Sequence, residues 1–167
     1  EAVDGSLAPS NQFQGSYAEL EKLVNSMKQG AVKTLVIHGL NPIYSFPKSI
    51  GFEDALSKVE NVIYVGFYLD ETARMASLVA AESSSFEAWG DVNPVKDVFS
   101  IVQPTIRPLW NTRSFLEVVM LAAQAKGVSV ADSAHDQVKS TWRGLQGKYS
   151  TGLGFDGFWD DCLQSGI

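Results

Sequence analysis

The sequence predicts an α/β fold with a small, mainly parallel sheet, on three observations. Short apolar runs at Thr34–His38, 61–67 and Leu78–Ala81 have the length and composition of buried strands. Segments with helical spacing separate the runs, so strand and helix alternate as in parallel crossover folds. The runs are continuously apolar, which is typical of parallel sheets with both faces covered. We therefore expect three layers, with helices on both sides of the sheet.

Capping signals and helical spacing predict the remaining elements. Ser16 and Glu19 have the spacing of a capping box, and Gly30 stands where a left-handed C-terminal cap would end that first helix. The same box recurs at 114–117, opening a helix that Gly127 would end. Two more apolar stripes follow, one through His135 to Leu145 and one around Phe158 to Leu163. These three helices predict an α-rich C-terminal extension.

The domain organisation follows from the same pattern. Residues 1–15 are polar and contain Gly5, Pro9 and Gly15, so we expect an extended lead-in. Residues 16–167 are then expected to form a single α/β domain, as a fragment of a longer chain.

Composition excludes several classes of function. The 167 residues are 45% hydrophobic and carry a net charge of −6, which argues against nucleic acid or an anionic membrane surface as a partner. No apolar run approaches the length that spans a bilayer, so no direct membrane insertion is expected. The single cysteine, Cys162, excludes an internal disulfide and a cysteine-ligated cluster built from this chain alone.

The ends of the first two strands are the candidate ligand site. Gly39 and Asn41-Pro42 stop the first strand abruptly, and Asp70 follows the second. In open α/β sheets, ligands bind at the carboxyl ends of the strands, where the following helices leave backbone N–H groups unpaired. Gly39 to Pro42 could cradle a phosphate or simply form a tight turn. Asp70 could bind ribose or guanine, or cap a helix, and capping is favoured.

Four motifs occur in the order found in a known family. They are Gly39-Leu40-Asn41-Pro42, Asp70-Glu71-Thr72-Ala73, Glu87-Ala88-Trp89-Gly90-Asp91, and Gln103-Pro104 with Pro108. This order resembles the Rossmann-like third domain of molybdopterin oxidoreductases. Within that family, the chain looks most similar to the iron–sulfur subunit of alternative complex III, a bacterial quinol:cytochrome c oxidoreductase. The narrower likeness adds Ile43-Tyr44 with Pro47, Trp110-Asn111-Thr112-Arg113, and Phe158-Trp159 with Gly166.

The resemblance implies a set of cofactor-binding positions. In the family, this domain holds one nucleotide arm of the bis-molybdopterin guanine dinucleotide cofactor. The matching residues here are Gly39, Asn41, Pro42, Asp70, Glu71, Thr72, Glu87 and Gly90. The residues themselves predict no catalytic group and no metal ligand, because the chain has no nucleophile elbow and neither His38 nor His135 has a second histidine or cysteine spaced to join it.

Departures from the family pattern decide between two functions. The family usually opens the third strand with Ala-Asp and ends it with proline, where this chain has Ala76-Ser77 and Ala81; Ser84 replaces a common histidine. The resemblance therefore implies a structural domain with a degenerate cofactor site, not catalytic alone, in the iron–sulfur subunit of a respiratory oxidoreductase. The alternative is a functional molybdopterin guanine dinucleotide-binding domain of a molybdenum oxidoreductase. A stand-alone nucleotide-binding protein is a weaker third hypothesis.

The resemblance also implies a cellular setting. We expect the partners to be other domains and subunits of a membrane-associated respiratory complex on the periplasmic side of the bacterial inner membrane. Iron–sulfur clusters would lie elsewhere in the parent protein, and this chain would hold no cofactor itself.

Overall fold

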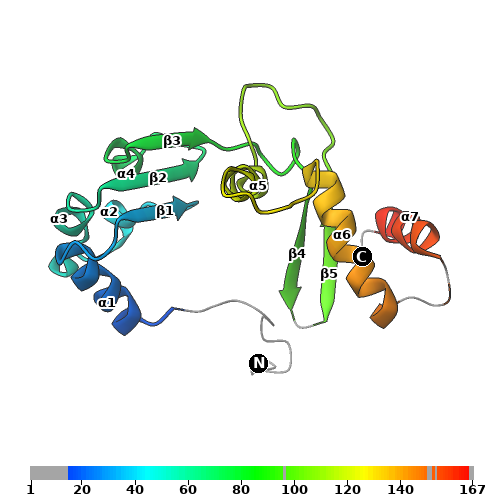
Figure 1. The fold of residues 1–167 in the computed structure, drawn as a ribbon, viewed down its shortest axis with the longest axis horizontal. Coiled ribbons are helices and arrows are strands. Elements are labelled where there is room, and N and C mark those ends of the chain that lie inside the picture. The colour runs from blue at the N-terminus through cyan, green and yellow to red at the C-terminus, as the bar shows by residue number, and fades with distance from the viewer. Residues whose placement is uncertain (1–14, 96, 150–151, 153, 166–167) are drawn as a thin grey trace, which may run out of the picture. The chain divides into compact units, whose positions relative to one another are not determined.

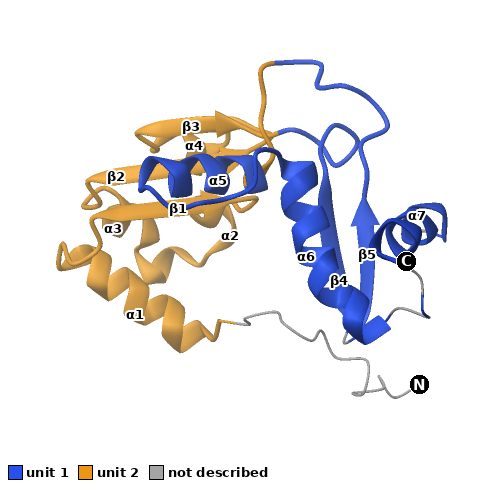
Figure 2. Cartoon of the chain, turned by 45° about the vertical axis from the view of Figure 1, so that its right-hand side comes forward, with its two compact units in different colours: residues 1–12, 83–110, 116–167 blue, residues 13–82, 111–115 orange. Residues whose placement is uncertain are grey.

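The computed structural model describes residues 15–95, 97–149, 152 and 154–165 (Figure 1). The predicted lead-in, apart from Gly15, lies outside the described residues. The chain divides into two compact units (Figure 2). We call residues 13–82 and 111–115 the sheet unit, and residues 83–110 and 116–167 the C-terminal unit. The single domain expected over 16–167 stays a prediction.

The sheet unit contains three parallel strands. They are β1 (Thr34–His38), β2 (Asn61–Gly66) and β3 (Leu78–Ala81), in the spatial order β1-β2-β3 (Figure 1). Val36 of β1 lies beside Ile63 of β2, which lies beside Leu78 of β3. All three carboxyl ends therefore meet at one edge of the sheet. The predicted α/β fold with a small parallel sheet is confirmed.

One helix precedes these strands and short helices join them. They are α1 (Tyr17–Lys28), α2 (Pro42–Ser45), the 3₁₀ helix η2 (Lys48–Ile50), α3 (Phe52–Leu56) and α4 (Glu71–Arg74). The predicted capping box is present: Ser16 Oγ accepts from Glu19 N at 3.2 Å, and Glu19 Oε2 accepts from Ser16 N at 2.6 Å. Gly30 follows α1 with φ +71°, in the left-handed conformation that its position predicts.

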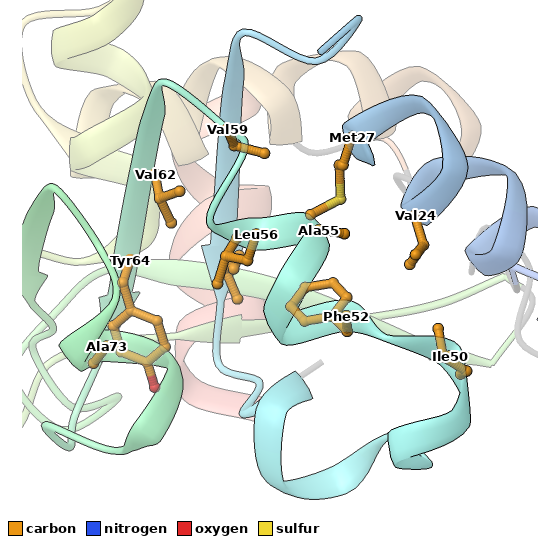
Figure 3. Close-up of a cluster of buried hydrophobic side chains, with 11 residues drawn as sticks. Val24, Met27, Ile50, Phe52, Ala55, Leu56, Val59, Val62, Tyr64 and Ala73 are labelled. Atoms are coloured by element: carbon orange, nitrogen blue, oxygen red, sulfur yellow. The ribbon is translucent and has the colours of Figure 1, made fainter. Parts of the chain in front are cut away.

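The core of the sheet unit lies on one face of the sheet (Figure 3). Val24 and Met27 of α1, with Leu56 of α3, pack into the cluster that includes Val62 and Tyr64 of β2. Alternation along the strands sends their neighbours to the opposite face. The members of this core are Val24, Met27, Ile37, Ile50, Phe52, Ala55, Leu56, Val59, Val62, Tyr64 and Ala73.

The opposite face is buried unevenly. Val65 of the central strand is fully buried, but Val36 is 49% exposed and Leu78 is 56% exposed. Val36 and Leu78 lie on β1 and β3, which flank β2 at the two sides of the sheet. Of the three apolar runs, only that of the central strand is largely buried on both faces.

The C-terminal unit combines a hairpin with helices. The strands β4 (Gly90–Val95) and β5 (Val98–Val102) are antiparallel, and Asp97 with φ +64° lies in the turn between them. The helices are α5 (Phe115–Ala125), α6 (Ala134–Tyr149) and α7 (Phe155–Ser165). The predicted helix-rich C-terminal part is confirmed. Sequence patterns do not indicate β4, because Gly90, Asn93 and Pro94 are poor strand formers.

A second hydrophobic core holds this unit together. It consists of Val138, Trp142, Phe158, Trp159 and Cys162. Within the part of the chain that the structure describes, no helix combines the length and the apolar character needed to cross a bilayer.

Candidate functional site

The carboxyl ends of β1 and β2 form a pocket, as the sequence predicts. Gly39, Asn41 and Asp70 all line this cavity of about 430 Å³, which we call the strand-edge pocket. The remaining lining residues are Leu40, Tyr64, Gly66, Phe67 and Tyr68. Parallel pairing brings the Gly39 and Asp70 turns to the same edge of the sheet.

Asn41 joins the two turns through its side-chain amide. Its Nδ2 donates to Glu71 Oε2 at 2.7 Å, and its Oδ1 accepts from Thr72 Oγ1 at 2.7 Å. Thr72 Oγ1 in turn accepts from Ile43 N at 3.2 Å, so a fully buried hydroxyl connects α4 to α2. The hydrogen bond from Asn41 is the main cause that lowers the pKa of the Glu71 carboxyl.

Asp70 caps the helix that follows it. Its Oδ1 accepts from Ala73 N at 2.8 Å, and its Oδ2 accepts from Tyr64 OH at 2.7 Å. The predicted capping role is therefore confirmed. Burial, and next the hydrogen bond to Asp70, raise the pKa of Tyr64 to about 12.

Gly39 and Pro42 shape the first turn. Gly39 has φ +64° and donates its N–H to Val65 O at 3.1 Å, while a Cβ at this position would meet nothing within 4 Å. Glycine is therefore needed here for the left-handed backbone, while a Cβ would meet no other described residue. Pro42 is buried and starts α2, where a missing N–H costs nothing.

The groups around this pocket do not fit a dinucleotide diphosphate. The side chains of Asn41 and Asp70 cap α2 and α4 by accepting from the N–H groups of Tyr44 and Ala73, so these two donors already have partners. None of the described lining residues is lysine or arginine, and the carboxylate of Asp70 lies in the wall. A phosphate would meet negative charge there.

Glu87 and Gly90 belong to the C-terminal unit. Glu87 accepts from Leu109 N at 2.9 Å and from Ser84 N at 2.8 Å, and these two backbone donors, Leu109 first, lower the pKa of its carboxyl. Gly90 opens β4 opposite Val102. Glu87 thus holds the backbone of its own loop, which family motif matching alone did not reveal.

The structure adds a pair that the sequence did not single out. His38 Nε2 lies 2.7 Å from Glu82 Oε1, and the ring of Phe115 stacks on His38 with centroids 3.9 Å apart. The Glu82 side chain is only 11% exposed, and its Oε2 has no hydrogen-bond partner among the described residues. Sequence patterns could not reveal this pair, because His38 ends β1, Glu82 follows β3, and β2 lies between these two strands.

No metal site emerges from the described residues. Nowhere among them do three or more histidine, cysteine, aspartate or glutamate side chains gather closely enough to hold an ion.

Comparison with known proteins gives partial matches. The chain is 33% identical over 94 residues to the menaquinone reductase molybdopterin-binding-like subunit of Nitratidesulfovibrio vulgaris. It is 30% identical over 91 residues to the NADPH-Fe(3+) oxidoreductase subunit alpha of Geobacter sulfurreducens. The chain is similar to oxidoreductase subunits. No protein-family model matches it.

These matches cover part of each protein. Each spans 54% of this chain, but only 14% of the menaquinone reductase subunit and 10% of the NADPH-Fe(3+) oxidoreductase subunit. They support the predicted resemblance to molybdopterin oxidoreductases at that general level. The narrower likeness to alternative complex III stays a prediction.

Proposed function

We propose that this chain is a structural domain of a respiratory electron-transfer subunit, with the fold of a molybdopterin oxidoreductase domain and a degenerate cofactor site. The similarity to a molybdopterin-binding-like subunit and to an oxidoreductase alpha subunit supports the general assignment. In this proposal the parent is the iron–sulfur subunit of a quinol:cytochrome c oxidoreductase. The domain alone does not catalyse a reaction.

The observation that carries the proposal is the hydrogen bonding at the strand-edge pocket. Asn41 bonds Glu71 and Thr72, and Asp70 bonds Tyr64 and Ala73. Asn41 thereby connects the two turns, Asp70 bonds within the segment from β2 to α4, and the polar groups expected to bind a nucleotide already have partners. A ligand would have to break these bonds, and breaking a hydrogen bond to a charged group costs about 1.5–3 kcal/mol.

One observation favours the second candidate, a functional nucleotide-binding domain. The strand-edge pocket has about 430 Å³ of space, within the range of small-molecule sites, and three of the eight family-matched residues line it. This candidate requires guanine or ribose to replace the present partners of Asn41 and Asp70.

Calorimetry with GDP separates the two candidates. We expect no saturable heat when millimolar GDP is titrated into the full chain at pH 7. Saturable binding of GDP that weakens at least tenfold in Asp70→Asn, with ADP as the matched control ligand, would overturn the structural assignment. Asp156→Asn, on α7 of the other unit, controls for loss of one negative charge.

We also propose the partners and location that the resemblance implies. The chain would contact other domains and subunits of a membrane-associated complex on the periplasmic side of a bacterial inner membrane. The full open reading frame tests this: cysteine quartets for iron–sulfur clusters in the parent support it. A frame without such cysteines contradicts it.

A further inference from the structure

We propose that the C-terminal unit contains a separate binding site for a small, flat aromatic molecule that carries a positive charge at one edge. The site is a cavity between β5, α6 and α7, which we call the aromatic pocket. Its volume is about 300 Å³. It is lined by Asp97, Val98, Phe99, Trp142, Leu145, Tyr149, Phe158, Asp161, Cys162 and Ser165.

Aromatic rings build the walls. Trp142 is 2% exposed and lies 6.2 Å from Phe158, centroid to centroid, while Phe99 lies 5.7 Å from Tyr149. Three different elements, β5, α6 and α7, contribute these rings. Flat ring faces with apolar neighbours favour a planar aromatic ligand, because rings stack or meet edge to face at such distances.

The position of Trp142 is fixed from outside the pocket. Its Nε1 donates to Asp91 Oδ2 at 3.2 Å, so its polar atom has a partner in β4. The indole therefore leaves no buried donor unsatisfied, and the half-buried rings of Phe99 and Tyr149 are the ones with surface free for a ligand. Trp142 can therefore contribute only apolar or stacking contacts to the pocket, because its one hydrogen-bond donor is already used.

The charged residues that line the pocket indicate the charge of the ligand. Asp97 and Asp161 are in the lining, and no lysine, arginine or histidine is. Asp97 is paired with Lys148 at 2.8 Å and accepts from Tyr149 OH at 3.0 Å, whereas Asp161 is exposed beside the cavity. The carboxylate of Asp161 therefore favours a cationic group at the edge of the ligand.

The size of the cavity also indicates a ligand. Small-molecule sites begin at about 300 Å³, and apolar cavities of about 150 Å³ already bind benzene. The aromatic pocket is thus large enough for one substituted ring. It shares no residue with the strand-edge pocket, so this inference does not depend on the proposed function.

Cys162 provides a specific reporter. It is the only cysteine of the sequence, it lines the aromatic pocket, and it is buried. Burial, and next the charge of Asp161, raise the pKa of its thiol, so its reaction with N-ethylmaleimide is slow. A molecule in the pocket would slow this reaction further.

The test compares three ligands of similar shape and different charge on the full chain: benzylamine, benzyl alcohol and phenylacetate at pH 7. We expect saturable protection of Cys162 from N-ethylmaleimide, followed by mass spectrometry, with benzylamine binding about tenfold more tightly than phenylacetate. Asp161→Asn should reduce benzylamine affinity to that of benzyl alcohol and leave benzyl alcohol unchanged. Asp160→Asn, one residue away and outside the lining, should change neither.

Three results would overturn the proposal. They are no saturable protection by any of the three ligands, equal affinity for benzylamine and phenylacetate, or equal effects of Asp161→Asn and Asp160→Asn. Calorimetry with the same ligands gives an independent affinity. Circular dichroism checks that each variant is folded. We expect both to fold, because Asp160 and Asp161 are exposed.

Discussion

Replacing the buried hydroxyl of Thr72 tests whether the turns after β1 and β2 stabilise each other. Thr72 is fully buried, donates to Asn41 Oδ1 at 2.7 Å and accepts from Ile43 N at 3.2 Å. Thr72→Val keeps the shape of the side chain but removes both hydrogen bonds. The N–H of Ile43 then loses its partner in a partly buried environment.

The expected loss follows from these two bonds. Each contributes about 1 kcal/mol net, so Thr72→Val should lower the free energy of unfolding by about 2 kcal/mol. Thr72→Ser is the matched control, because it keeps the hydroxyl and removes one buried methyl group, at a cost of about 1 kcal/mol. Combining Thr72→Val with Asn41→Ala should give a coupling energy of about 1 kcal/mol, since both changes remove the same hydrogen bond.

Urea unfolding followed by circular dichroism measures five proteins: the unsubstituted chain, Thr72→Val, Thr72→Ser, Asn41→Ala and the double variant. The slope of the free energy against urea should be unchanged, because the surface exposed on unfolding is the same. If Thr72→Val is as stable as the unsubstituted chain, or if the coupling energy is below about 0.3 kcal/mol, the turns do not depend on this hydroxyl. The assignment of Asn41 and Thr72 to a structural role would then be wrong.

Three further predictions test single groups. The pKa of Tyr64 is raised from 10.0 to about 12, so the protonated phenol stabilises the fold fully below pH 10, and this stabilisation is lost as the pH rises towards 12. Ultraviolet titration measures this pKa, and Tyr64→Phe should remove the loss of stability at alkaline pH. Gly51→Ala should lower the free energy of unfolding by about 1–2 kcal/mol, because φ is +67° at this position. Gly144→Ala, inside helix α6, should leave the free energy of unfolding unchanged or raise it by up to about 1 kcal/mol, and thermal unfolding measures both variants. Glu87→Gln should speed hydrogen exchange at Ser84 N and Leu109 N, and unchanged exchange would contradict its loop-holding role.

Local patterns predicted most elements of the fold. The capping box at Ser16 and Glu19 fixed the start of α1, and the apolar runs located β1, β2 and β3. The sequence also predicted that Gly39 and Asp70 would meet, because parallel strands end at one edge. It could not predict that Asn41 would bond Glu71 and Thr72, since those groups are 30 and 31 residues away along the chain.

In the C-terminal unit, too, the sequence predicted the helices but not how their side chains pack together. Helical spacing predicted the helices that carry Trp142 and Phe158, but no pattern indicated that their rings would enclose a cavity with Phe99 and Cys162. Cavities depend on how side chains from separate elements fill the space between them, and single-sequence patterns contain no such information.

The sequence by itself determined where strands and helices form, which residues turn the chain, and the absence of a disulfide, because these depend on near neighbours and composition. Only the tertiary structure decided which polar groups are paired between elements far apart along the chain. It joined His38 to Glu82 across a strand, 44 residues apart, and gave Asn41 and Asp70 partners within the chain. The reason is physical: the availability of a side chain for a ligand depends on the partners that strand register brings within hydrogen-bond distance.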